Sequence, residues 1–294
     1  MNQKSIILSA LFAAALLLLV LPAAAESSGD FKYALNDDGT VKITQYTGRA
    51  AELKIPAKLD GKKVTVIGKT AFYKRNSLTS VTTPDSVTKI GDAAFSDCSN
   101  LTSVTLPNSV TSIEKEVFFG CISLTNMTIP DSVTSIGEDA FRACLSLTGV
   151  TILDGVTGIG KWMFMNCVNL TSVSIPGSVT MIGEGAFSSC ASLTSVIIPD
   201  GVTSIGLRAF GLCSKLTSVT IPKSVTSIGN GAFFGCSSLT SMTIPDSVTK
   251  IGFAAFSDCP NLTLTVSHAS YAEQYCKKYD ITYMYPDSLD WLNN

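Results

Sequence analysis

Cysteine is the residue type in this chain with the most chemistry to offer, and its spacing is regular. Eight thiols follow one another at intervals of 23 residues, and a ninth, Cys276, lies beyond them. The eight are Cys98, Cys121, Cys144, Cys167, Cys190, Cys213, Cys236 and Cys259. Zinc sites use closely spaced ligand pairs, and no CxxC pair occurs here. One thiol every 23 residues is typical of a repeat protein, in which each repeat returns a side chain to the same place.

The oxidation state of these thiols is the first chemical question. Cysteines in a secreted chain usually form disulfides. Cysteines of adjacent repeats lie within disulfide range, but their Cβ atoms point in parallel directions rather than toward each other. Cysteine also suits a core as a small apolar residue. We therefore expect free buried thiols with no metal or redox function, and scattered disulfides are the alternative.

Acidic residues form a second periodic set, at the position that follows the proline of the repeat. A row of carboxylates offers the oxygen ligands that calcium prefers. However, Asn108, Gly177 and Lys223 interrupt the row, and aspartate is common in turns. We expect these residues to form turns. They are Asp85, Asp131, Asp154, Asp200 and Asp246.

The single histidine, His268, would have to serve any Ser-His-Asp or Cys-His mechanism. It lies in the C-terminal segment beside serines, where a structural role is expected. No paired-carboxylate motif, glycine-rich phosphate loop or HExxH motif is present. The sequence therefore predicts no catalytic residue, no metal and no cofactor, and the chain is not expected to be an enzyme.

The composition limits the class of partner. The chain has 294 residues, 46% of them hydrophobic and only 15% charged, and its net charge is −2. A surface that binds phosphates needs clustered lysines and arginines, and no basic run is present. Nucleic acid is therefore not expected as a partner.

The N-terminus has the pattern of a secretory signal. Lys4 precedes an apolar stretch from Ile6 to about Leu21, and three alanines end at Ala25. We expect cleavage near Ala25, no membrane span afterwards, and a secreted or cell-surface location. The C-terminus, which includes Trp291, has no apolar span or basic tail.

Each repeat contains the pattern of two short strands and a core segment. Residues 104–106 alternate apolar and hydroxyl side chains and precede Pro107, and residues 110–113 form the second strand. After Ile136, Gly137 relieves a tight backbone position, and residues 139–141 start a short helical or 3-10 segment. The core column contains the phenylalanines that recur nine times: Phe72, Phe95, Phe118, Phe141, Phe164, Phe187, Phe210, Phe233 and Phe256.

The repeat pattern LxxVxIPxxVxxIGxxAFxxC resembles the BspA-type bacterial leucine-rich repeats, also called the treponemal class. The resemblance covers about residues 64–283. It implies a mostly β solenoid of about nine 23-residue coils with short helical or 3-10 turns. The domains expected are a signal peptide (1–25), an N-terminal cap with a degenerate first repeat (26–63), the solenoid (64–262) and a C-terminal cap (263–294). The last comprises a closing helix over 268–276 and an edge strand over 281–283.

Four departures from the pattern are local. The degenerate first repeat carries five extra residues centred on Asp60-Gly61. Glu114 replaces the glycine of its copy, Leu153 replaces the proline, and Thr83 replaces an isoleucine. We expect slightly irregular coils at these positions, with the period intact.

Two surfaces are candidates for recognition. The first, the sheet face, is rich in hydroxyl groups, and threonine also suits a solvated strand without any ligand. The second, the turn-side cluster, has large apolar residues at variable positions next to the phenylalanine column, where they either anchor a partner or cover the column's edge. The sheet face comprises Thr105, Thr128, Thr151, Ile197 and Thr220; the turn-side cluster comprises Trp162, Phe119, Met165, Phe234, Tyr73, Leu207 and Phe253.

The resemblance implies protein–protein recognition outside the cell, by adhesion to host, matrix or neighbouring-cell proteins. A carbohydrate-binding module is the first alternative. Carbohydrate sites usually contain clustered aromatic residues, and the two tryptophans of this chain, Trp162 and Trp291, are far apart in sequence. A structural envelope spacer without a specific ligand is the second. The oligomeric state stays open.

Overall fold

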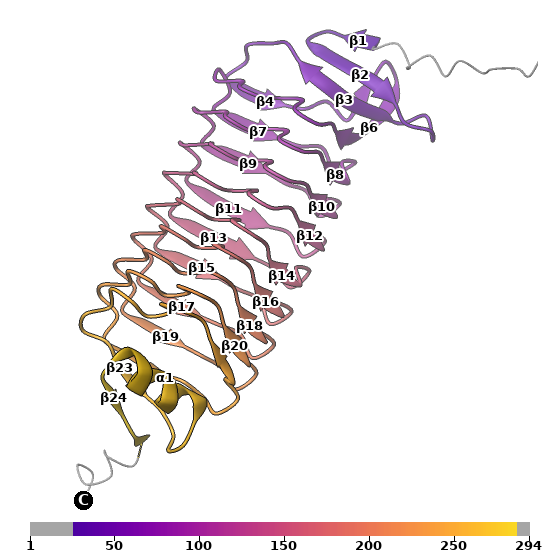
Figure 1. The fold of residues 1–294 in the computed structure, drawn as a ribbon. Coiled ribbons are helices and arrows are strands. Elements are labelled where there is room, and N and C mark those ends of the chain that lie inside the picture. The colour runs from indigo at the N-terminus through magenta and orange to yellow at the C-terminus, as the bar shows by residue number, and fades with distance from the viewer. Residues whose placement is uncertain (1–25, 287–294) are drawn as a thin grey trace, which may run out of the picture.

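The chain folds into an elongated β-solenoid (Figure 1). The computed structural model describes residues 26–286, which form about eleven turns of roughly 23 residues. The expected solenoid is confirmed, with slightly more turns than the nine phenylalanine-bearing coils. The expected signal peptide and Trp291 lie outside the described residues. Within residues 26–286, no helix has both the length and the apolar character that a bilayer crossing requires.

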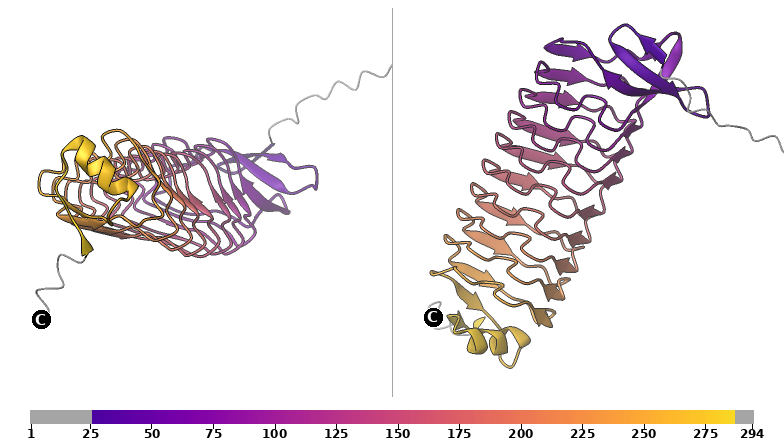
Figure 2. Two further views of the ribbon diagram at one scale, coloured as in Figure 1. Left: turned by 60° about the horizontal axis from the view of Figure 1, so that its bottom comes forward. Right: turned by 45° about the horizontal axis from the view of Figure 1, so that its top comes forward.

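Two columns of short strands run along the stack, and both are visible in the right-hand view of Figure 2. The first column contains β4 (Glu52–Lys54), β7 (Ser80–Thr82), β9 (Ser103–Thr105), β11 (Asn126–Ile129), β13 (Gly149–Ile152), β15 (Ser172–Ser174), β17 (Ser195–Ile197), β19 (Ser218–Thr220), β21 (Ser241–Thr243), β23 (Thr263–Thr265) and β24 (Tyr283–Met284). The second contains β6 (Lys62–Ile67), β8 (Lys89–Ile90), β10 (Ser112–Ile113), β12 (Ser135–Ile136), β14 (Gly158–Ile159), β16 (Met181–Ile182), β18 (Ser204–Ile205), β20 (Ser227–Ile228) and β22 (Lys250–Ile251). The first column is divided into three sheets and the second into two, and within each sheet the strands of a column pair in parallel. Ser195 thus lies beside Ser218.

The third side of each coil, the turn side, is a run of turns. Residues two before and two after the core phenylalanine have left-handed backbone, as at Ala93 (φ 51°) and Asp97 (φ 57°). Such alternation stops a regular helix from forming. The N–H groups of Ala93, Phe95 and Asp97 instead donate to carbonyls of the next coil at 2.7–2.9 Å. These bonds between coils offset the cost of left-handed backbone at residues other than glycine.

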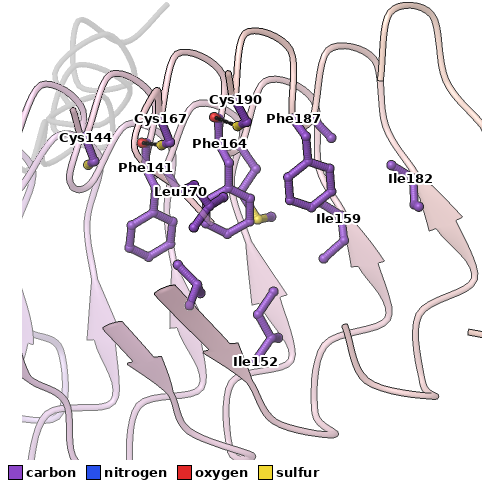
Figure 3. Close-up of a cluster of buried hydrophobic side chains, with 14 of the residues drawn as sticks. Phe141, Cys144, Ile152, Ile159, Phe164, Cys167, Leu170, Ile182, Phe187 and Cys190 are labelled. Carbon is purple, nitrogen blue, oxygen red and sulfur yellow. Dashed lines mark hydrogen bonds between the residues drawn. The ribbon is translucent and has the colours of Figure 1, made fainter. Parts of the chain in front are cut away.

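Phenylalanine and cysteine form parallel columns inside the stack (Figure 3). From Phe72 to Phe256, neighbouring rings stack with centroids 4.8–5.6 Å apart and planes within 18°. Phe31 and Tyr46 continue the ring column into the N-terminal cap with tilted contacts. The core is therefore one continuous apolar rod rather than a series of separate clusters.

The N-terminal end is closed by an antiparallel meander of β1 (Glu26–Ser28), β2 (Phe31–Leu35) and β3 (Val41–Tyr46). Strand β3 then pairs in parallel with β6 and joins the second column. The five extra residues form a hairpin of β5 (Lys58–Leu59) with β6. Its turn is Asp60-Gly61, where both residues have positive φ. The dipeptide Asp-Gly is the sequence signal for such a turn.

The C-terminal end is closed by a helix and an edge strand, which begin two or three residues later than the expected 268–276 and 281–283. Helix α1 (Tyr271–Tyr279) lies across the end of the stack in the left view of Figure 2. Ser270 caps the helix by accepting from the Glu273 N–H, and the Glu273 carboxylate accepts from the Ala269 N–H, one residue before the cap, in a variant of the capping box. Strand β24 pairs with β23 and ends the first column.

The three irregular copies keep the period. The Glu114 N–H donates to Ile90 as the glycines of other copies do, and the Glu114 carboxylate pairs with Lys89 at 2.7 Å. Thr83 is buried, and its hydroxyl donates to the carbonyl of Thr105. Leu153 has the N–H that proline lacks and donates to Ile129, where β11 and β13 are four residues long. Its side chain is exposed.

Candidate functional site

The thiol column is closed to chemistry by burial and hydrogen bonding. Each of the eight periodic thiols donates to the carbonyl of the phenylalanine 26 residues earlier, at 3.0–3.2 Å. Burial raises the pKa of Cys167 and of Cys213 to about 12. All nine cysteines are unpaired in the structure, and among the eight only Cys259 is partly exposed. Their regular spacing therefore serves the core.

The other candidates for chemistry lie apart from one another. The aspartates that follow proline lie in the turns between the two strand columns. Across residues 26–286 no group of three or more His, Cys, Asp or Glu side chains is placed to hold a metal ion. The ring of His268 stacks on Tyr285 with centroids 3.6 Å apart, within the C-terminal cap.

The sheet face is exposed along the first strand column. Thr105, Thr128, Thr151 and Thr220 all point into solvent, and Ile197 is 79% exposed. Gly149 lies among them without a side chain, and a shallow hollow of about 540 Å³ lies over β11, β13, β15 and β17. The face carries no charged residue from β9 to β21. It offers a neutral, hydroxyl-rich strip with one large apolar side chain.

Threonines on either side of this strip have a structural role. The hydroxyls of Thr102, Thr148 and Thr171 donate to the carbonyl of the threonine one coil earlier, at 2.8–3.1 Å. Thr111 and Thr203 do the same beside the second column. The hydroxyl content of the sequence therefore reflects bonds between coils as well as an available surface.

The turn side brings part of the turn-side cluster together. Trp162 and Met165 from one coil and Leu207 from the second coil after it line one hollow of about 390 Å³. The remaining lining residues are Glu184, Gly185, Ser188 and Arg208. We refer to this cavity as the turn-side hollow. It joins residues 45 positions apart in sequence because the coils between them add only one strand spacing each.

Cations surround the aromatic members of the cluster. The Lys161 ammonium lies 3.9 Å from the centroid of the Trp162 ring, and the same ammonium pairs with Glu184 at 2.9 Å. The Arg142 guanidinium lies between Phe119 and Trp162, 5.8 and 5.9 Å from their centroids. These distances allow cation–π attraction. Phe119, Arg142 and Trp162 thus form a continuous surface with the turn-side hollow.

A glycine in the following coil fixes the position of Trp162. Trp162 has left-handed backbone (φ 55°), and the corresponding residue one coil later is Gly185. A Cβ atom on Gly185 would lie 2.5 Å from Cδ1 of Trp162, so the indole rests directly on that glycine. The same arrangement places Arg208 over Gly231.

The other cluster members lie elsewhere. Tyr73 lies near the N-terminal end with Lys74 beside its ring. Phe253 is 70% exposed and meets Tyr279 of helix α1 edge-on, so it belongs to the C-terminal end. Phe234 lies one coil beyond the turn-side hollow, with its ring 5.8 Å from the Arg208 guanidinium.

Sequence reasoning missed Arg142, Arg208 and Gly185 as parts of the surface. An alignment of the repeats contains a signal for Arg208 and Gly185. A large residue is followed by glycine 23 positions later at Trp162 and Gly185, and again at Arg208 and Gly231. The position of Arg142 between two rings depends on side-chain conformations, which the repeat pattern does not contain.

Comparisons with known proteins agree on the repeat. The family model described as "BspA type Leucine rich repeat region (6 copies)" matches residues 65–193 and 180–276. A leucine-rich repeat protein of Treponema pallidum is 26% identical, with 88% of this chain and 98% of that chain covered and a TM-score of 0.54. A leucine-rich cell surface protein of Faecalibacterium prausnitzii is 28% identical, with 85% and 96% covered and a TM-score of 0.41. No curated protein matches the chain.

Proposed function

Because the chain belongs to the BspA-type leucine-rich repeat family, we propose that it is a secreted or cell-surface protein that recognises other proteins. Its partner is an extracellular protein of a host, of a matrix or of a neighbouring cell, and its role is adhesion. The signal-like segment that ends at Ala25 supports export. Fold alone does not establish function, so the proposal depends on the surface.

The observation that carries the proposal is the contiguous turn-side surface of Phe119, Arg142, Trp162, Met165 and Leu207. Tryptophan and arginine dominate the binding energy of protein interfaces, where they lie in hollows surrounded by weaker contacts. A soluble repeat has no need of large apolar groups at variable outer positions. Binding, rather than catalysis, suits this arrangement.

The test compares binding of the mature chain to an array of matrix proteins, host surface proteins and glycans. We expect binding to at least one protein and to no glycan. Trp162→Ala should weaken that binding by about 2 kcal/mol or more, as expected for a hot-spot tryptophan, and leave the thermal midpoint within a few degrees. Leu145→Ala is the matched control, because Leu145 is an exposed apolar residue outside the turn-side hollow.

Each alternative has its own outcome on the same array. Binding to glycans alone would favour a carbohydrate module, whose most suitable surface is the neutral sheet face around Gly149. Binding to nothing would favour a structural spacer. Equal protein binding by Trp162→Ala and the unchanged chain would move the recognition surface away from the turn side.

A further inference from the structure

We propose that the turn-side hollow binds a peptide segment in which an apolar side chain stands next to a carboxylate. The inference rests on the proposed function and specifies the chemistry of the partner at that site. The apolar group enters the hollow between Trp162, Met165 and Leu207, and the carboxylate meets the guanidinium of Arg208.

The apolar part of the proposal follows from the lining. Trp162, Met165 and Leu207 supply three large apolar walls of the hollow, and Gly185 lines it beneath the Trp162 indole. A volume of about 390 Å³ exceeds what one side chain requires, so the neighbouring backbone of a peptide also fits. Methionine and tryptophan adapt to branched and aromatic groups alike.

The charged part follows from pairing. Lys161 is neutralised by Glu184 at 2.9 Å, and Arg142 by Asp139 at 3.2 Å. Within residues 26–286, Arg208 forms no ion pair with a carboxylate, and its guanidinium lies 5.8 Å from the centroid of the Phe234 ring. Arg208 therefore lines the hollow as a cation without a carboxylate partner, and a carboxylate of a bound peptide complements its charge.

The structure also holds Arg208 in place. Its Cγ lies 3.3 Å from where a Cβ of Gly231 would be, so the stem rests on that glycine. The Phe234 ring lies beside the guanidinium, with its centroid 5.8 Å away. An arginine with a supported stem loses less freedom on binding and presents its planar donors to a carboxylate in a fork.

The experiment uses Trp162 as its own reporter. In a Trp291→Phe background, Trp162 is the only tryptophan, since the chain has two. Its indole N–H resonance is followed while three probes are added: the peptides acetyl-Gly-Gly-Leu-Glu-Gly-Gly-amide and its Leu-Gln and Ala-Glu counterparts. We expect the Leu-Glu peptide to shift the resonance to saturation, and the Leu-Gln peptide to bind about three- to fivefold more weakly, the size of an exposed ion pair. The Ala-Glu peptide should bind more weakly still, because the apolar group is lost.

Variants identify the cation. Arg208→Gln should remove the preference for Leu-Glu over Leu-Gln, and Arg208→Lys should retain part of it. Lys215→Gln is the matched control, because it removes an exposed lysine outside the hollow and should leave the preference unchanged. The preference should also shrink as salt is raised, since exposed charges are screened.

The proposal is overturned if Leu-Glu and Leu-Gln bind equally well to the unchanged chain. It is also overturned if no peptide shifts the Trp162 resonance at concentrations up to about 5 mM, since a dissociation constant of about 1 mM already corresponds to only about 4 kcal/mol of binding free energy. Either result leaves protein recognition intact as long as Trp162→Ala abolishes binding on the array. If Trp162→Ala loses binding on the array while the Leu-Glu and Leu-Gln peptides bind equally well, only the carboxylate preference proposed here is contradicted.

Discussion

At the scale of residues, two columns with the same period stabilise the solenoid in different ways. The phenylalanines contact one another face to face, so their contribution is burial and dispersion. Each periodic cysteine, in contrast, donates its thiol hydrogen to the backbone carbonyl of a phenylalanine. Both columns could be predicted from the 23-residue period, because side chains in one register must share one environment. The carbonyl that accepts from each thiol could not, because it depends on the turn geometry.

Removing one ring from the middle of the column should be costly. Phe187 stacks between Phe164 and Phe210 at 5.4 and 5.3 Å, and neither neighbour can fill the space it leaves. We expect Phe187→Ala to lower the free energy of unfolding by about 3–5 kcal/mol. Ser188→Ala, at the adjacent residue, should change it far less. Equal shifts of the thermal midpoint in the two variants would refute the assigned register.

The thiols should react according to exposure. Iodoacetamide attacks the thiolate, and burial holds Cys167 and Cys213 protonated at pH 8. We expect the folded protein to take up one label rapidly, at Cys259, and the remaining cysteines to react only after unfolding. Mass spectrometry of labelled peptides measures this, and Cys259→Ser should abolish the rapid phase. A mass showing paired cysteines before alkylation would contradict the prediction.

At the scale of elements, the coil spacing determines where glycine is required. The glycine after the second strand faces the backbone of the preceding coil. At Gly229, a Cβ would lie 2.6 Å from both the Gly206 carbonyl carbon and the Leu207 nitrogen. The need for glycine here was predicted from the sequence. Its cause is close approach between coils, since the φ of Gly229 is not positive.

Gly229→Ala should therefore destabilise the fold by about 1–3 kcal/mol, the range for overpacking, because backbone atoms cannot move aside. Gly177→Ala is the matched control, since its Cβ would meet nothing within 4 Å. We expect that variant to be neutral or slightly stabilising through the unfolded state. Chemical denaturation measures both, and similar effects would contradict the close-approach argument.

The C-terminal helix should be sensitive to acid. Lys277, the Tyr285 hydroxyl and the Ala269 N–H stabilise the Glu273 carboxylate and lower its pKa from 4.5 to about 2. A lowered pKa in the folded state contributes stability that is complete above pH 4.5 and is lost as the pH falls through 2. Amide exchange of residues 271–279, corrected for intrinsic rates, should show protection falling over that window.

Glu273→Gln is the control for this pH dependence. It removes the charge, so protection of α1 should be weaker at pH 7 and nearly constant down to pH 2. A protection profile of the unchanged chain that is flat over the same range would show that the stability of α1 does not depend on the Glu273 carboxylate.

At the scale of the whole molecule, the two ends are the weak points of the stack. An open end would expose the apolar rod and an unpaired strand edge. Strand β24 covers the edge of β23, and Tyr275 of helix α1 meets Phe256 edge-on. The C-terminal cap could be predicted from its resemblance to known closing helices. The N-terminal meander could not, since it lies outside the repeat and its strands pair antiparallel.

Truncation after Val266 should therefore make the protein associate end to end. The exposed edge of β23 and the end of the ring column would pair with another copy, because a second stack offers the same strand spacing. Light scattering after size exclusion should show mass rising with concentration for the truncated chain. A monomer at every concentration tested would mean that the edge strand and helix are not what keeps the stacks apart.

Trp162 packs on Gly185 and Arg208 packs on Gly231, so mutation of either glycine changes this surface. The outer contour of one coil depends on a residue that belongs to the coil after it. Replacing Gly185 by alanine would displace the indole of Trp162 and leave every residue of the tryptophan's own coil unaltered. Substitution of a glycine that has no side chain of its own on the surface can therefore alter the surface of the preceding coil. A comparison of variants restricted to the bulky positions would overlook Gly185 and Gly231.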